Sequence, residues 1–179
     1  MVKRPPFIVS TIDVPERSHV YPRSDEPMAP GRAVGKQAGL QRLGLHVVRV
    51  PPGSRTSWPH AEEDEEEFCY VLEGEVDAWV DGALHRMTKG DLIAWPVGTG
   101  ICHTILNDGE VEALLLAGGE AARAGSRIYY PLHPGRRDDL PWSAWWQDVP
   151  KRKQGKHDGM PAALRKKVGG RATKGSKKR

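Results

Sequence analysis

The stretch WPHAEEDEEEFCYVLEG, residues 58–74, places one histidine ahead of six consecutive acidic residues and then a strand-like apolar run. Carboxylates repel one another and are costly to bury unless a cation or hydrogen-bond donors pair with them. The acidic run is therefore either a loop in water or, in part, a group of ligands that faces a cation inside the fold.

Short apolar segments around this stretch predict an all-β fold. Between residues 40 and 118, seven or eight candidate strands end at Gly, Asp or Asn, which favour turns. The segment EVDAWVDGALHRM, residues 75–87, predicts a hairpin with Asp81 and Gly82 in its turn. No long amphipathic helix pattern interrupts these segments, so we expect an antiparallel sandwich or barrel.

Composition divides the chain into four parts. Residues 1–39, rich in proline, glycine and charge, predict an N-terminal arm with a short strand at residues 6–12, and residues 40–118 predict the barrel. Residues 119–150 predict an extension whose aromatic side chains pack on the barrel or on a partner subunit. Residues 151–179 predict a basic, disordered tail. The aromatic residues of the extension are Tyr129, Tyr130, Trp142, Trp145 and Trp146.

The net charge of +4 combines an acidic body with this basic tail. Residues 151–179 hold twelve Lys and Arg against one acidic residue, whereas residues 1–150 hold 15 basic and 22 acidic residues. The tail lacks interleaved aromatic residues, so nucleic-acid binding is not expected. Two cysteines, no apolar signal-peptide core and no run of about 18 apolar residues predict a cytoplasmic protein without a membrane segment.

Strand parity predicts that four polar residues share one interior if their faces line a single barrel. Residues two apart on a strand point to the same face, so His60 and Glu62 would share a face. Glu67 has the other parity, so a turn must lie within residues 63–66, and His103 lies in a separate apolar segment. Imidazole and carboxylate groups in an apolar pocket are typical ligands of a divalent transition metal. Such an ion would offset the cost of burying Glu62 and Glu67, while residues 63–66 could lie on a solvated turn.

Two motifs at defined spacing resemble those of the cupin family, in particular its small single-domain bacterial members. The first motif reads Gly, a gap, His-x-His, three or four residues, Glu, six residues, Gly. The second reads Gly, five residues, Pro-x-Gly, a gap, His, three residues, Asn. The matching residues are Gly53, His60, Glu67 and Gly74, then Gly90, Pro96, Gly98, His103 and Asn107, with four residues in place of two before His103. The resemblance covers roughly residues 40–118. It implies one double-stranded β-helix, or jelly-roll, barrel and a homodimer.

The resemblance carries the family's metal set over to His60, Glu67 and His103. Glu62 stands where the family usually has its second histidine, so it is a candidate ligand by position only. Two interpretations stay open: Glu62 is a fourth metal ligand, or it turns away from a two-His-one-carboxylate set and acts as a catalytic acid or base. The implied cofactor is a divalent transition metal, with Fe or Mn favoured and Zn or Ni possible.

Two functional hypotheses follow for the barrel. The first is a metal-dependent cupin enzyme that acts on a small organic molecule by oxygenase, isomerase or lyase chemistry. The second is a non-catalytic cupin that captures a sugar, an aromatic compound or a hormone-like ligand. The sequence has no glycine-rich phosphate loop, Gly-x-Ser-x-Gly elbow or Cys-x-x-Cys pair.

Overall fold

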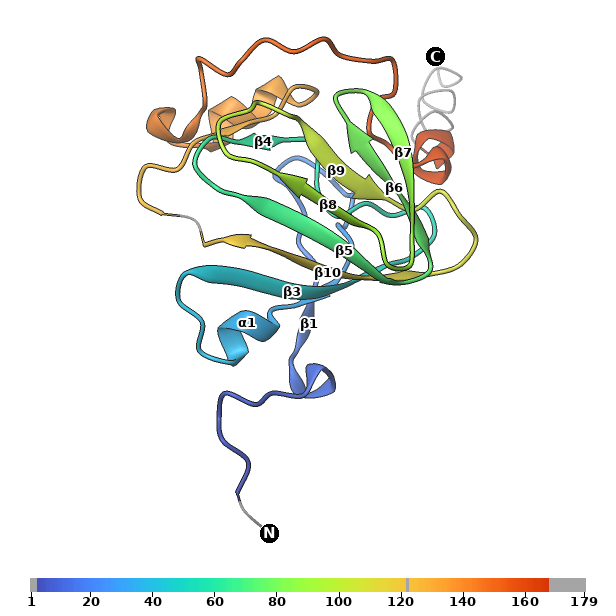
Figure 1. The fold of residues 1–179 in the computed structure, drawn as a ribbon. Coiled ribbons are helices and arrows are strands. Elements are labelled where there is room, and N and C mark those ends of the chain that lie inside the picture. Colours follow the sequence, from blue (N-terminus) through green and yellow to red (C-terminus); the bar gives the residue numbers. More distant parts are fainter. Residues whose placement is uncertain (1–2, 122, 168–179) are drawn as a thin grey trace, which may run out of the picture.

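A computed structural model describes residues 3–121 and 123–167 of the chain. Its centre is a β-barrel of eight strands between residues 43 and 120 (Figure 1). All paired strands run antiparallel, which confirms the expected all-β barrel. The barrel strands are β3 (Leu43–Val50), β4 (Ala61–Glu62), β5 (Glu67–Glu73), β6 (Glu75–Val80), β7 (Ala83–Thr88), β8 (Leu92–Trp95), β9 (His103–Leu106) and β10 (Ala113–Glu120).

Three sheets make up the β-structure of the described residues. The largest has the strand order β1-β2-β3-β10-β5-β8, where β1 (Glu16–Arg17) and β2 (Gly31–Arg32) come from the N-terminal arm. The second has the order β7-β6-β9, and the third pairs β4 with β11 (Ile128–Tyr129). The β6–β7 hairpin turns at Asp81 and Gly82, both with positive φ, as the sequence predicts.

Alternation along the strands separates an interior core from an outer cluster. The interior core holds Val50, Val71, Val76, Ile105 and Leu115, each at most 2% exposed. Trp79 has the opposite parity to Ala78 and belongs to a second cluster outside the barrel, yet it is 0% exposed. Other parts of the chain must therefore cover the outer face of β6.

The C-terminal extension supplies this cover. After β11, the chain forms the short 3-10 helices η2 (Pro134–Asp139) and η3 (Trp142–Ala144), which lie along one side of the barrel (Figure 1). Tyr130, Trp145 and Trp146 are buried, and Tyr129 is half-buried. Trp142 differs, since it is 63% exposed with the Arg137 guanidinium 4.0 Å above its ring.

The tail over residues 151–167 is not the free segment that its composition predicts. Its Gly155 amide donates to the Asp81 carbonyl (2.6 Å), and its His157 carbonyl accepts a hydrogen bond from the Trp79 indole (2.7 Å). Residues 162–167 are helical. The tail residues follow the hairpin turn because their backbone groups satisfy buried polar atoms there. Residues 168–179 lie outside the described residues, so disorder there stays a prediction.

Arg55 joins both extensions to the barrel. Its side chain is only 1% exposed, and its guanidinium donates to both carboxylate oxygens of Glu26 in the N-terminal arm, at 2.7 Å each. A third N–H donates to the Gly159 carbonyl (2.7 Å). A buried guanidinium needs such partners, so the segments around Glu26 and Gly159 are part of the folded unit.

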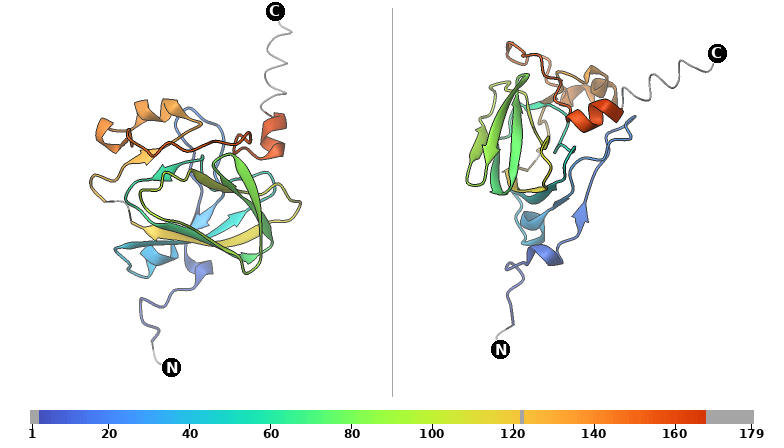
Figure 2. Two further views of the ribbon diagram at one scale, coloured as in Figure 1. Left: turned by 45° about the horizontal axis from the view of Figure 1, so that its top comes forward. Right: turned by 90° about the vertical axis from the view of Figure 1, so that its right-hand side faces the viewer.

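The N-terminal arm departs from the expected strand at residues 6–12. Residues 6–10 form no strand, and η1 (Thr11–Asp13) is a 3-10 turn, because no neighbouring strand pairs with this segment. The start of the arm leads away from the barrel, with Phe7 67% and Ile12 82% exposed (Figure 2). Farther on, α1 (Val34–Gln37) packs against β3. The homodimer stays a prediction. Within the described residues, none of the helices has the length and apolar character needed to cross a membrane.

Asn107, the last residue of the second motif, fastens the loop after β9. It is 0% exposed, and its amide nitrogen donates to the carbonyls of Val50 (2.7 Å) and Val111 (2.8 Å). Its side-chain oxygen accepts the Gly109 N–H (2.9 Å). One amide thus satisfies three backbone groups, a structural reason for this residue type.

We expect Asn107→Ala to lower the free energy of unfolding by about 2–4 kcal/mol, because buried backbone groups lose their partners. Urea unfolding followed by circular dichroism measures the change. Lys89→Ala, in an exposed turn, is the control and should change stability by less than about 0.5 kcal/mol. An Asn107→Ala variant as stable as this control would show that the amide does not fasten the loop.

Candidate metal centre

The two predicted histidines lie directly opposite each other in the backbone. The His60 N–H donates to the His103 carbonyl (3.1 Å), and the His103 N–H donates to the His60 carbonyl (2.8 Å). Directly opposed residues of an antiparallel pair project their side chains to the same face. The two imidazole rings accordingly lie side by side, with centroids 4.8 Å apart.

Glu67 approaches the same point from the other sheet. It is the first residue of β5, opposite Trp95 of β8 and Gly119 of β10. A Cβ atom at Gly119 would lie 2.6 Å from the Glu66 carbonyl oxygen and 3.1 Å from Cγ of Glu67, so only glycine fits beside this carboxylate. The position of Glu67 is thus fixed by strand register and by a neighbour without a side chain.

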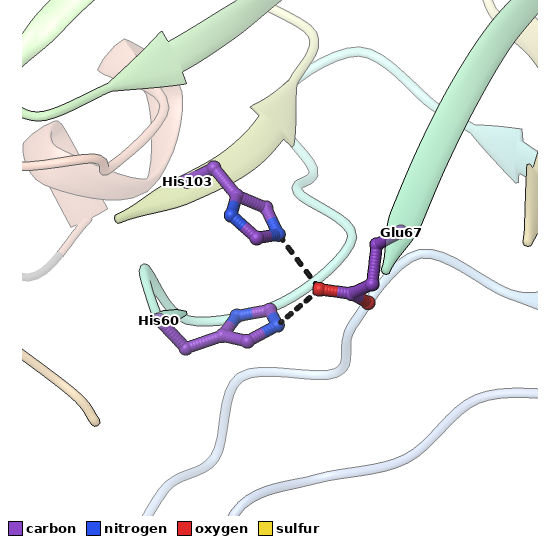
Figure 3. A group of neighbouring side chains, drawn as sticks. All are labelled: His60, Glu67 and His103. Atoms are coloured by element: carbon purple, nitrogen blue, oxygen red, sulfur yellow. Dashed lines mark hydrogen bonds and ion pairs between the residues drawn. The ribbon is translucent and has the colours of Figure 1, made fainter. Parts of the chain in front are cut away.

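The three side chains converge on one point (Figure 3). Oε2 of Glu67 lies 3.0 Å from Nε2 of His103 and 3.6 Å from Nε2 of His60. One nitrogen or oxygen from each residue lies within 4.8 Å of the others. Three of the four predicted ligands are therefore adjacent.

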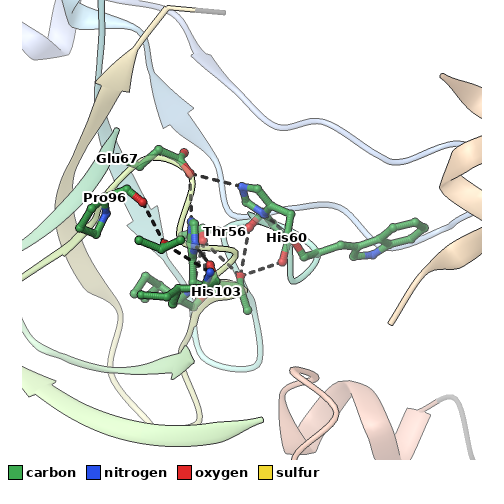
Figure 4. Close-up of polar contacts among 11 residues, drawn as sticks. Thr56, His60, Glu67, Pro96 and His103 are labelled. Carbon is green, nitrogen blue, oxygen red and sulfur yellow. Dashed lines mark hydrogen bonds and ion pairs between the residues drawn. The ribbon is translucent and has the colours of Figure 1, made fainter. Parts of the chain in front are cut away.

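Backbone carbonyls determine which ring nitrogens face Glu67. Nδ1 of His60 lies 2.8 Å from the Trp58 carbonyl, and Nδ1 of His103 lies 3.1 Å from the Ile101 carbonyl (Figure 4). A carbonyl oxygen only accepts hydrogen bonds, so each Nδ1 carries the proton. In the neutral rings both Nε2 lone pairs then point at a carboxylate, an arrangement that requires a cation between them.

Without a metal, that cation is a proton, and the pKa values reflect this. Burial opposes charge on His60, but the hydrogen bond to Glu67 and the charges of Glu67 and Glu62 raise its pKa to about 9. Burial and the neighbouring His60 lower the pKa of His103. Burial opposes the Glu67 anion, yet the two imidazoles beside it hold the pKa of Glu67 below its usual range.

Aromatic residues hold each imidazole in place. Trp95 stacks on His103 at 3.8 Å between ring centroids. Trp58, whose carbonyl binds His60, is itself held between Tyr21 of the N-terminal arm (4.3 Å) and His133 of the C-terminal extension (3.9 Å). Both extensions therefore support the position of His60, which sequence reasoning alone did not reveal.

Glu62 stands apart from the three converging residues. It shares a cavity with His60, as parity predicts, but its carboxylate is not within the 4.8 Å group. Burial raises its pKa to about 8; the His60 charge opposes this, and the charges of Glu67, Glu65 and Asp64 add to it.

The other acidic residues of the run, 63–66, form a turn that is only partly solvated. Residues 63–66 do form the turn that parity requires, and Asp64 and Glu66 are exposed. Glu63, however, is held by Arg127, and Glu65 is half-buried with its pKa raised by burial. The guanidinium of Arg127, which lies beyond the barrel in the sequence, therefore compensates one acid of the turn that the sequence allows to be solvated.

The cluster lies in a cavity of about 900 Å³. Its inner part is lined by the cluster, Glu62, Trp95, and the hydroxyl residues Thr56, Ser57 and Thr104. The N-terminal arm and β3 line the rest with Arg17, His19, Tyr21, Lys36, Gln37 and His46. The sequence alone does not predict that residues of the N-terminal arm line the cavity, because their position depends on pairing between residues far apart in the sequence.

Comparisons with known proteins agree with this architecture. Residues 46–118 match the Cupin_2 family model, a cupin domain. A candidate sugar phosphate isomerase from Acidithiobacillus ferrooxidans is 22% identical with a TM-score of 0.64, over 70% of this chain and 81% of that chain. A sugar phosphate isomerase of the cupin superfamily from Silicibacter pomeroyi is 26% identical with a TM-score of 0.61, over 69% and 80%. The polyketide cyclase RemF from Streptomyces resistomycificus is 22% identical with a TM-score of 0.54, over 82% and 100%.

No curated protein matches the chain. The family match covers both histidines and Glu67, and the similar structures share the barrel. Residues 46–118 of this chain are therefore a cupin domain.

Proposed function

We propose that this cupin is a metal-dependent enzyme that acts on a small organic molecule, with His60, Glu67 and His103 as the metal ligands. The observation that carries the proposal is the convergence of two Nε2 lone pairs and one carboxylate inside a cavity, with both Nδ1 atoms bound to backbone carbonyls. Metal-binding histidines in proteins are oriented by such bonds from the second ring nitrogen.

The distances from Glu67 to the two imidazoles fit a single ion. Ligand atoms about 2.1 Å from one metal lie roughly 3–4 Å from each other. The separations of 3.0 and 3.6 Å from Glu67 to the two imidazoles fall in this range. Two nitrogens and one carboxylate oxygen suit Fe or Mn, and Zn or Ni is compatible. Three protein ligands leave coordination positions open, as in catalytic sites.

The residues around the site support proton transfer as the protein's part of the reaction. A bound divalent ion polarises a carbonyl group and stabilises negative charge on oxygen. We propose that Glu62, in the same cavity but outside the cluster, takes a proton from a carbon next to that carbonyl and returns it elsewhere. Its pKa of about 8 lets the carboxyl group hold or release a proton near neutral pH.

Isomerase chemistry is the reaction class that we favour. The similar protein from Silicibacter pomeroyi is named a sugar phosphate isomerase. The cavity of about 900 Å³ has room for a molecule of that size, and its hydroxyl residues can bind a polyhydroxylated substrate.

We predict that protein purified without an affinity tag contains about one Fe or Mn ion per chain. His103→Ala and Glu67→Ala should remain folded and lose the ion, because each removes one of only three ligands. Inductively coupled plasma mass spectrometry measures the metal content, and circular dichroism checks the fold. His85→Ala, an exposed histidine on β7, is the matched control and should keep the metal. Metal-free wild-type protein whose melting temperature is unchanged by added Mn(II) would reject the proposal.

We predict that Mn(II) binding strengthens with pH. The proton held on the His60 side chain, with a pKa of about 9, must leave before Nε2 can bind a metal. The apparent Kd should therefore fall as the pH rises from 6 to 8 in Glu62→Gln, where the Glu62 carboxyl group cannot contribute. The slope should be at most about tenfold per pH unit, because loss of the Glu62 charge lowers the His60 pKa. Electron paramagnetic resonance of free Mn(II) gives the Kd values. A Kd that is constant across this range would show that binding releases no proton from His60.

We predict that Glu62→Gln keeps the metal but lowers turnover by about 100-fold or more, because the amide cannot transfer the proton. The assay incubates the metal-loaded enzyme with a panel of sugar phosphates in D2O and follows exchange of carbon-bound hydrogen by 1H NMR. Glu65→Gln, an acid of the same run that does not line the cavity, is the control. Full turnover in Glu62→Gln would show that Glu62 does not transfer the proton. Wild-type protein that binds metal and ligands without turnover would support the alternative, a non-catalytic ligand-binding cupin.

A further inference from the structure

We propose that the cavity takes a small organic phosphate whose phosphate group binds between Arg17 and Lys36 at the cavity mouth. The other end of the molecule would reach the metal centre. That second part rests on the proposed function, whereas the anion site depends on residues outside the metal cluster. The argument combines strand register, ion pairing and the distribution of charge in the cavity.

Strand register places Arg17 on the inner face of the large sheet. Arg17 of β1 lies opposite Gly31 of β2, and Gly31 lies opposite Val48 of β3. Opposed residues share a face, and Val48 belongs to the interior core. The neighbouring residue Glu16 projects to the outer face, where it pairs with Arg49 at 2.6 Å.

Gly31 leaves the space beside Arg17 open. A Cβ atom at this position would lie 3.3 Å from Cγ2 of Val48, so a larger residue would press on the core side chain and fill part of the cavity. Arg17, Gly31 and Val48 all line the cavity. The Arg17 side chain therefore borders the cavity next to a residue without a side chain.

Neither cation at the mouth has an acidic partner among the described residues. Ten of the fourteen described arginines form an ion pair with a carboxylate. Arg17 is not among these ten, and Lys36 forms no ion pair with a carboxylate of the described residues. Both side chains are exposed and line the cavity. Two unpaired positive charges at the mouth of a concave site attract and concentrate an anionic ligand.

Uncharged donors beside these cations favour phosphate over carboxylate. Burial lowers the pKa values of His19 and His46, so both imidazoles are neutral near pH 7 and can each donate one N–H. Gln37 adds an amide at the same mouth. A phosphate group offers several oxygens to such a ring of donors, and a guanidinium can bind two of them at once.

Two of the three acidic residues that line the cavity, Glu62 and Glu67, belong to the region around the metal centre. The third acid of the lining, Glu120, pairs with Arg123 at 3.2 Å. A phosphorylated molecule would therefore enter with its anionic group held at the mouth. Its uncharged, oxygen-bearing end would then face His60, His103 and Glu62.

Isothermal titration with inorganic phosphate tests the anion site on the full chain, in two forms: metal-loaded wild type and the His103→Ala variant. We expect phosphate to bind both forms. Arg17→Gln and Lys36→Gln should each weaken binding about tenfold, and the double variant should show none. Arg42→Gln, an exposed arginine outside the cavity lining and without an ion pair, is the matched control and should stay within about twofold.

Three results would overturn the anion site: no phosphate binding by wild type, full binding by the double variant, or binding that disappears in His103→Ala. The last would place phosphate on the metal instead of at the mouth. Malonate that binds more tightly than phosphate would reject the choice of phosphate. Wild-type protein that binds phosphate but lacks metal would reject the proposed function and leave the anion site in place.

Discussion

The carboxylate of Glu67 lies between two imidazoles whose Nδ1–H groups donate hydrogen bonds to backbone carbonyls. Nitrogen lone pairs and a carboxylate repel one another unless a cation lies between them. The fold brings them together all the same, through the backbone pairing of His60 with His103 and the register of β5 with β10. This constraint makes a buried metal centre the consistent interpretation of the barrel interior.

The parts of the chain outside the barrel also help to hold the site residues in position. Trp58, which orients His60, is held between a tyrosine of the N-terminal arm and a histidine of the C-terminal extension. Arg55 joins the arm and the tail through Glu26 and Gly159. The arm also supplies the open side of the cavity, including Arg17. The extensions therefore position the site, and residues outside the family motifs line part of the cavity.

Local patterns were sufficient to predict the barrel and most of its centre. Alternation along the strands placed Glu67 and His103 on inner faces, and motif spacing joined them to His60. The same patterns could not predict that Arg127 would pair with Glu63, or that residues 151–167 would cover Trp79. These contacts join segments more than 60 residues apart and follow no period in the sequence. Parity cannot predict the role of Glu62, because it fixes the face of a residue but not its distance from a neighbour.

Anomalous diffraction from crystals of the tag-free protein tests the central claim most directly. Data collected on both sides of the Fe and Mn absorption edges locate either ion without reference to activity. We predict one anomalous peak about 2.0–2.3 Å from Nε2 of His60, Nε2 of His103 and a carboxylate oxygen of Glu67. Crystals of metal-supplemented protein in which Glu67 hydrogen-bonds directly to both imidazoles, with no peak between them, would contradict the account.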